Sequence, residues 1–94
     1  MDAASTSLLG EWHQIHPDPD PASISITFET GGRLRYTIET TTVQHILLTW
    51  HVEGDTIVTD QPSAPREERT RFHFAEPRRL ILERAGETYA YERV

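Results

Sequence analysis

Residues 23–39 read SISITFETGGRLRYTIE, and this stretch decides the fold class. Apolar residues occupy every second position over 24–28 and again over 34–38. Alternation with a period of two predicts a β-strand that buries one face. The two runs are separated by Gly31-Gly32, and because glycine accepts the positive φ of tight turns, this pair predicts a β-hairpin.

The same alternation, interrupted by turn residues, continues on both sides of this hairpin. Six further strands are expected, at residues 9–16, 46–52, 57–59, 72–74, 80–82 and 89–91. No stretch of a dozen residues shows the apolar spacing of a helix. We therefore predict an all-β chain folded as a single antiparallel up-and-down β-barrel of about eight short strands without a substantial helix, since closure removes exposed sheet edges.

Composition narrows the class of protein and its partners. The 94 residues contain no cysteine and have a formal net charge of −6. Absence of cysteine suits a reducing compartment, and the first seven residues lack the basic end and apolar run of a signal peptide, so we expect a cytoplasmic protein. No apolar run is long enough to span a membrane, and no basic face is available for nucleic acid, so neither partner is expected.

Loop length predicts where a binding site would lie. In an up-and-down meander the loops alternate between the two ends of the barrel. Short turns fall at one end, whereas longer, proline-containing or irregular connections fall at the other, namely 17–21, 40–42, 60–66 and 85–87. Because functional residues concentrate on loops carried by a rigid scaffold, we expect the site at this second, open end. Residues 1–7 are expected to form a flexible segment and residues 8–94 the single barrel domain.

Parity along the strands separates inward from outward side chains. Most inward residues are bulky, so we expect them to fill the closed half of the barrel. Toward the open end the inward positions become polar. The expected ligand-binding residues are the polar and aromatic ones near that end: His16, Tyr36, Gln44, Glu68, Arg84 and Tyr89. The Arg84 guanidinium could bind a carboxylate or phosphate, or it could simply pair with Glu68 at the surface.

Two short motifs at the ends of the barrel sequence carry a family resemblance. Gly10-Glu11-Trp12 opens the first expected strand, and Tyr91-Glu92-Arg93 closes the last. Together they resemble the lipocalin-like (calycin) barrels, in which a Trp near the start of the first strand is covered by an Arg from the last strand at the closed end. The resemblance implies a structural role for Gly10, Trp12 and Arg93. This chain is much shorter than typical lipocalins, which argues against a large ligand.

Catalytic and metal-binding motifs are scarce. No nucleophile elbow, phosphate loop or dinucleotide fingerprint occurs, so no cofactor is expected. His16, Asp18 and Asp20 could meet at the open end as oxygen-rich metal ligands, but Asp between prolines more often forms turns, so no metal is expected either.

Three functions remain open. The first is a non-enzymatic small binding module that engages a small ligand or a protein at the open end. The second follows from the resemblance, since some lipocalin-like barrels are cyclases or isomerases, and His16, Tyr36, Glu68 and Tyr89 would then be the catalytic candidates.

The third function is that of a protein inhibitor, an immunity-type partner or a homodimer with a filled barrel. Four apolar residues have outward parity and would mark a protein interface if they lay together: Ile15, Leu47, Val58 and Ile81.

Overall fold

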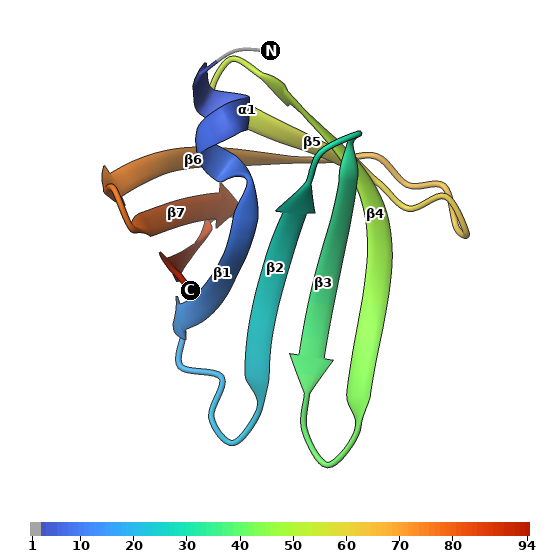
Figure 1. Cartoon of the computed structure of the whole chain (residues 1–94), viewed down its shortest axis with the longest axis vertical. Helices are drawn as coiled ribbons and strands as arrows, with labels where there is room; N and C mark the ends of the chain where they lie inside the picture. The colour runs from blue at the N-terminus through green and yellow to red at the C-terminus, as the bar shows by residue number, and fades with distance from the viewer. Residues whose placement is uncertain (1–2) are drawn as a thin grey trace.

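A computed structural model describes residues 3–94 as a closed barrel of eight antiparallel strands that follow one another in sequence order (Figure 1). The elements are α1 (Ala3–Leu8), β1 (Gly10–His16), β2 (Ser23–Glu29), β3 (Arg33–Glu39), β4 (Val43–Glu53), β5 (Thr56–Asp60), β6 (Glu68–Glu76), β7 (Arg79–Arg84) and β8 (Glu87–Arg93). β8 pairs with β1 and closes the ring. The predicted all-β, up-and-down barrel is confirmed.

The hairpin of β2 and β3 forms as its sequence predicts. The strands pair from Ser23 opposite Glu39 to Glu29 opposite Arg33. Gly31 and Gly32 connect them, with φ values of 83° and 76°. Both values lie in the left-handed region that side chains other than glycine rarely adopt, so the two glycines permit the tight turn.

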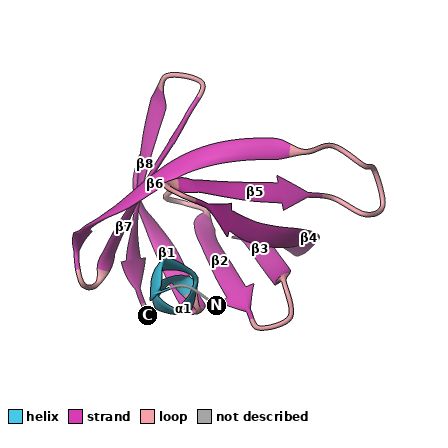
Figure 2. Ribbon diagram, turned by 90° about the horizontal axis from the view of Figure 1, so that it is seen from above, coloured by secondary structure: helices cyan, strands magenta, loops and turns pink. Residues whose placement is uncertain are grey.

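A short helix, which the sequence analysis did not predict, covers one end of the barrel. α1 lies largely within residues 1–7, which were expected to form a flexible segment. Residues 1 and 2 lie outside the part of the chain that the structure describes. Figure 2 shows α1 at the end of the barrel where β1 begins. Leu8, at the end of α1, is fully buried, and its carbonyl accepts a hydrogen bond from the Trp12 indole N–H at 2.9 Å. A helix of six residues has little intrinsic stability, so this packing must hold it in place.

Aromatic and aliphatic side chains fill this closed end. Trp12 and Leu80 are, like Leu8, fully buried. The rings of Phe28 and Trp50 pack edge to face with centroids 5.0 Å apart. Fully buried side chains of this size supply much of the apolar burial of so small a domain. The prediction of a filled closed half agrees with this packing.

The four outward apolar residues do not form the interface patch considered from the sequence. Val58 is buried, with 3% exposed, because its outer-face neighbours His51 and Arg69 on the adjacent strands are both bound to Glu53, at 2.8 Å and 3.0 Å. Ile81 is half-buried. Ile15 on β1 and Leu47 on β4 remain exposed, but β2 and β3 lie between them.

Within residues 3–94, no helix is long and apolar enough to cross a membrane.

Candidate functional site

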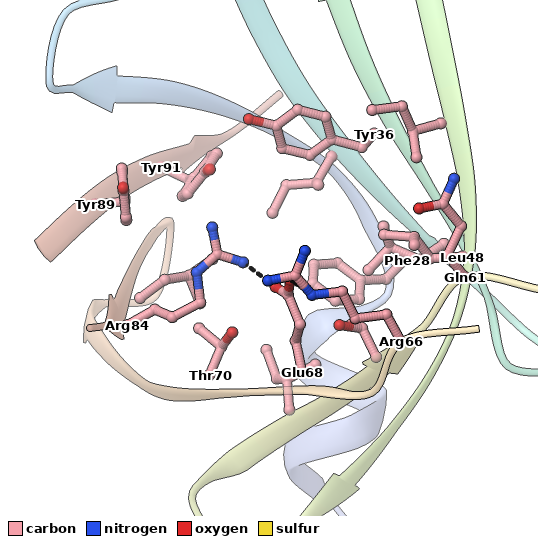
Figure 3. A pocket seen from close by; sticks show the side chains of 16 residues that line it. Phe28, Tyr36, Leu48, Gln61, Arg66, Glu68, Thr70, Arg84, Tyr89 and Tyr91 are labelled. Carbon is pink, nitrogen blue, oxygen red and sulfur yellow. Dashed lines mark hydrogen bonds and ion pairs between the residues drawn. The ribbon is translucent and has the colours of Figure 1, made fainter. Parts of the chain in front are cut away.

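A cavity of about 400 Å³ lies between the β2–β3–β4 side of the barrel and the strands β5 to β8 (Figure 3). Part of its wall is apolar and includes Phe28, Leu34, Leu48 and Ile57. These residues have the inward parity expected of them. They surround a space rather than filling the barrel throughout, and Phe28, Leu34 and Ile57 belong also to the buried core that contains Leu8 and Trp12.

Polar groups from the second half of the chain gather on one side of this cavity. They come from the loop after β5, from β6, from the end of β7 and from β8: Gln61, Arg66, Glu68, Thr70, Arg84, Tyr89 and Tyr91. Tyr36 on β3 and Thr59 on β5 complete the polar lining. A cavity that has an apolar wall and convergent polar groups has the general form of a small-molecule site.

Four of the six expected ligand-binding residues line the cavity, and two do not. Tyr36, Glu68, Arg84 and Tyr89 are brought together, although they lie on β3, β6, β7 and β8. Their shared inward parity is the feature that made them predictable. The closed barrel thus brings residues from four strands to one space.

His16 lies outside the cavity because β1 contains a bulge. The β1–β8 register pairs Gln14 with Tyr91 but His16 with Ala90, so the pairing shifts between Gln14 and His16. Gln14 and Tyr91 both have inward parity, whereas Ala90 has outward parity. The one-residue bulge therefore reverses the face on which His16, the last residue of β1, lies, and this side chain is exposed to solvent.

Asp18, in the loop after β1, makes a local turn contact. Its carboxylate accepts a hydrogen bond from the backbone N–H of Asp20 at 3.0 Å.

Gln44 keeps its inward parity but lies beyond the cavity. It pairs with Ile38 near the β3–β4 turn and is exposed, whereas Ile46, two residues further along the strand, lines the cavity. Parity places a side chain on a face of the sheet, but it does not say how far along the strand the cavity extends.

Arg66 and Gln61 line the cavity although sequence parity gave no reason to expect them there. They belong to the connection between β5 and β6, where no strand alternation applies. The Asp60 carboxylate accepts the Arg66 backbone N–H at 2.8 Å and folds this loop back on itself. An Asp six residues before the Arg, in a proline-containing loop, is the only sequence signal for such a closure, and it is weak.

Two arginines converge on one carboxylate at the polar side of the cavity. Arg84 forms a hydrogen-bonded ion pair with Glu68, which is one of the two alternatives expected from the sequence. The Arg66 guanidinium lies 3.5 Å from the same carboxylate. Figure 3 shows the two guanidinium groups meeting beside Glu68. With two positive charges and one negative charge, the charged lining has a net charge of +1, in a chain whose formal net charge is −6.

Three tyrosines supply neutral hydroxyl groups. Burial raises the pKa of the Tyr36 phenol, and burial together with its Tyr36 neighbour raises that of Tyr91. The pKa of Tyr89 is also raised, because its hydroxyl donates a hydrogen bond to the Glu87 carboxylate. The Tyr91 hydroxyl donates to Gln14 Oε1 at 3.2 Å. At neutral pH these groups keep their protons and are neutral hydrogen-bond donors and acceptors.

Metal ligation has no support in the geometry of the described chain. Within residues 3–94, no three His, Asp or Glu side chains are close enough to share a metal ion. The cavity contains a single carboxylate, Glu68, and both of its neighbouring cations are arginines. The arrangement is suited to binding a small molecule through apolar contact and charge.

Comparisons of this chain with protein-family models, with curated protein sequences and with solved structures found no match.

Proposed function

We propose that this protein is a non-enzymatic binding module whose cavity holds one small ligand with an apolar body and an anionic group. The observation that supports it is the pair of arginines, Arg66 and Arg84, which share the single carboxylate of Glu68 in a cavity that also has an apolar wall. One guanidinium charge is left without a protein counter-charge in the cavity. A carboxylate on the ligand would supply it.

Arginine is the residue type that suits this task. Its planar guanidinium binds a carboxylate through two parallel hydrogen bonds, which fixes the orientation of the ligand as well as its charge. The acidic surface of the protein disfavours anions in general. Binding must therefore combine local attraction by the arginines with burial of apolar ligand surface against Phe28 and Leu48, at about 25 cal/mol per Å².

Cavity size limits the ligand to a small molecule. A volume of about 400 Å³ lies at the lower end of the range of roughly 300 to 1,000 Å³ found for ligand pockets. The raised pKa values of Tyr36 and Tyr91 keep both phenols protonated at neutral pH, so neither of them supplies a general base there. This favours retention of a ligand over a reaction that begins with proton abstraction by these tyrosines.

We further propose that the barrel is of the lipocalin-like type. The Arg93 guanidinium carbon lies 4.2 Å from the ring centroid of Trp12, at the closed end that α1 covers. This is the contact that the Gly10-Glu11-Trp12 and Tyr91-Glu92-Arg93 motifs implied. The strand order of the closed barrel is compatible with the same assignment.

A displacement titration tests the proposed ligand class. The probe is anilinonaphthalene sulfonate, a fluorescent apolar anion, and the competitors are decanoate, decanol and decyltrimethylammonium. We expect decanoate to displace the probe at a concentration about tenfold lower than decanol, since a hydrogen bond to a charged group contributes about 1.5 kcal/mol or more. The cationic competitor should displace the probe least.

Matched variants connect the effect to the cavity. Arg84→Gln should weaken decanoate binding about tenfold and leave decanol binding unchanged. Arg33→Gln is the control, because Arg33 is an exposed arginine of β3 outside the cavity lining. The proposal is wrong if wild-type protein does not bind the probe, or if the three competitors displace it equally well.

A further inference from the structure

The first half of β4 has a partner strand on one edge only. β4 contains 11 residues and pairs with β3 from Val43 to Thr49. Its pairing with β5 covers only Thr49 to Glu53, because β5 ends at Asp60 and the chain then leaves the sheet. Figure 1 shows this part of β4 running on beyond β5 with β3 on its one side. Among the described residues, no strand pairs with the other edge of 43–48.

The hydrogen bonds between β3 and β4 determine which backbone groups of β4 face the free edge. The Trp50 backbone N–H donates to the Gly32 carbonyl at 2.9 Å, on the β3 side. In an antiparallel strand, successive residues direct their N–H and C=O groups to opposite neighbours. Residues 44, 46 and 48 therefore bond to β3, whereas Val43, His45 and Leu47 direct their backbone groups to the free edge.

This edge lacks the features that usually protect a sheet edge from pairing with another strand. Residues 43–48 read VQHILL and contain neither a proline nor a formally charged residue. Val43 and Leu47 point outward and are 54% and 65% exposed. Natural sheet edges are commonly blocked by lysine, proline, a bulge or a covering segment, so an unblocked edge of this kind is a template for another strand.

We propose that this edge of β4 pairs with the same edge of a second copy of this chain, antiparallel and about a two-fold axis at His45. In that register His45 stands opposite His45 of the second copy, and Val43 stands opposite its Leu47. Every backbone group that Val43, His45 and Leu47 direct to the free edge then finds a partner. Both exposed apolar residues of the strand become cross-strand neighbours of each other.

Other registers leave part of the edge unpaired. An axis at Ile46 would place Val43 opposite Thr49, whose backbone groups already face β5. An axis between two residues would put inward side chains of one copy beside outward side chains of the other. The register centred on His45 is thus the one in which the segment is complementary to itself, and this is why the occupant is a second copy.

Charge restricts where two copies of this chain can meet. Two chains with a formal net charge of −6 each repel one another over most of their surfaces. Residues 43–48 contribute no formal charge to that repulsion. The pairing does not rest on the ligand proposal, although it brings Gln44 of the second copy opposite Ile46, which lines the cavity.

Sedimentation equilibrium from micromolar to millimolar protein tests the pairing. We expect the wild-type mass to rise from monomer to dimer with concentration. Leu47→Lys places a charge at an exposed position of the edge and should weaken the dimer about tenfold or more, with an unchanged far-ultraviolet circular dichroism spectrum. The control is Ile15→Lys, at an exposed apolar residue of β1 that is 38% exposed and should leave the dimer unchanged. A monomeric wild type at all concentrations overturns the proposal.

Cysteine variants of this cysteine-free chain test the register. Residues of a hydrogen-bonded antiparallel pair have Cα atoms about 5.5 Å apart, which a disulfide can span. His45→Cys should therefore form a disulfide-linked dimer under mild oxidation. Leu47→Cys, whose two copies would lie four residues apart along the strands, should form little. Equal cross-linking of both variants, or none of His45→Cys, would contradict the axis at His45.

Discussion

Arg93, the last residue of β8, stacks on Trp12 of β1 with its guanidinium carbon 4.2 Å from the ring centroid. The same guanidinium donates hydrogen bonds to the carbonyls of Ser7 and Leu9, at 2.5 Å and 2.8 Å. One side chain thus joins the last strand, the first strand and the end of α1. The contact ties together the two ends of the chain where the barrel closes.

Gly10 is placed where a side chain would disturb this contact. Its φ is 116°, and a Cβ atom there would lie 3.0 Å from the Arg93 Nη1 atom. Gly10→Ala should lower the free energy of unfolding by about 1 to 3 kcal/mol, from backbone strain and displacement of the guanidinium. The measurement is urea denaturation followed by tryptophan fluorescence.

Gly31→Ala is the matched control for Gly10→Ala. Gly31 also has a positive φ, 83°, but a Cβ atom there would meet nothing within 4 Å. Both variants place a side chain on a residue of positive φ, and only the Gly10→Ala methyl group meets Arg93. If the two variants lose equal stability, the close approach to Arg93 contributes nothing.

Trp12 is the side chain on which the closed end depends most. It is fully buried, and its indole N–H bonds to the Leu8 carbonyl. Trp12→Ala should cost about 3 to 5 kcal/mol, a large part of the stability of a small domain. If that variant does not fold, Trp12→Phe is the alternative, because phenylalanine keeps most of the apolar volume but cannot donate to the Leu8 carbonyl. Trp12→Phe should lower the free energy of unfolding by about 1 to 3 kcal/mol. Calorimetry would contradict this role if neither variant unfolded at a lower temperature than Leu47→Ala.

Arg84 should matter for ligand binding and little for stability. Its ion pair with Glu68 is exposed to solvent, with half of the Arg84 side chain accessible, at 51%. Exposed pairs contribute about 0 to 1 kcal/mol, so Arg84→Ala should unfold in urea within about 1 kcal/mol of wild type. A loss of several kcal/mol would show that this arginine holds the barrel together.

Alkaline pH should destabilise the fold through the buried tyrosines. The pKa values of Tyr36 and Tyr91 are raised above the ordinary 10.0, so the folded state keeps phenol protons that the unfolded state releases. Their contribution to stability is complete below pH 10 and is lost as the pH rises from 10 through the folded pKa values. Phenolate absorbance should therefore appear at higher pH in native than in denatured protein.

Tyr91→Phe should remove part of this pH dependence. The difference between the native and denatured titrations should shrink, and the free energy of unfolding should fall less steeply above pH 10. Coincident native and denatured titration curves for wild-type protein would show that Tyr36 and Tyr91 are as accessible as free tyrosine.

Much of the cavity lining followed from strand parity, and the exceptions have local causes. Tyr36 and Glu68 line the cavity because regular alternation holds along the paired parts of β3 and β6. His16 does not, because the bulge in β1 depends on how β8 pairs with that strand, and the residues of β1 contain no signal for it. Arg66 was missed because a loop has no parity, and its position is set by the bond to Asp60.

The amino-acid sequence by itself determined the strands, their order and the closed end, because alternation and turn-forming glycines act over a few residues at a time. The Gly10-Glu11-Trp12 and Tyr91-Glu92-Arg93 motifs identified the contact that closes the barrel. Only the tertiary structure decided the cavity, the burial of Val58 and the free edge of β4. These depend on where β5 ends relative to β4 and on how strands distant in sequence align, which is a property of the closed sheet as a whole.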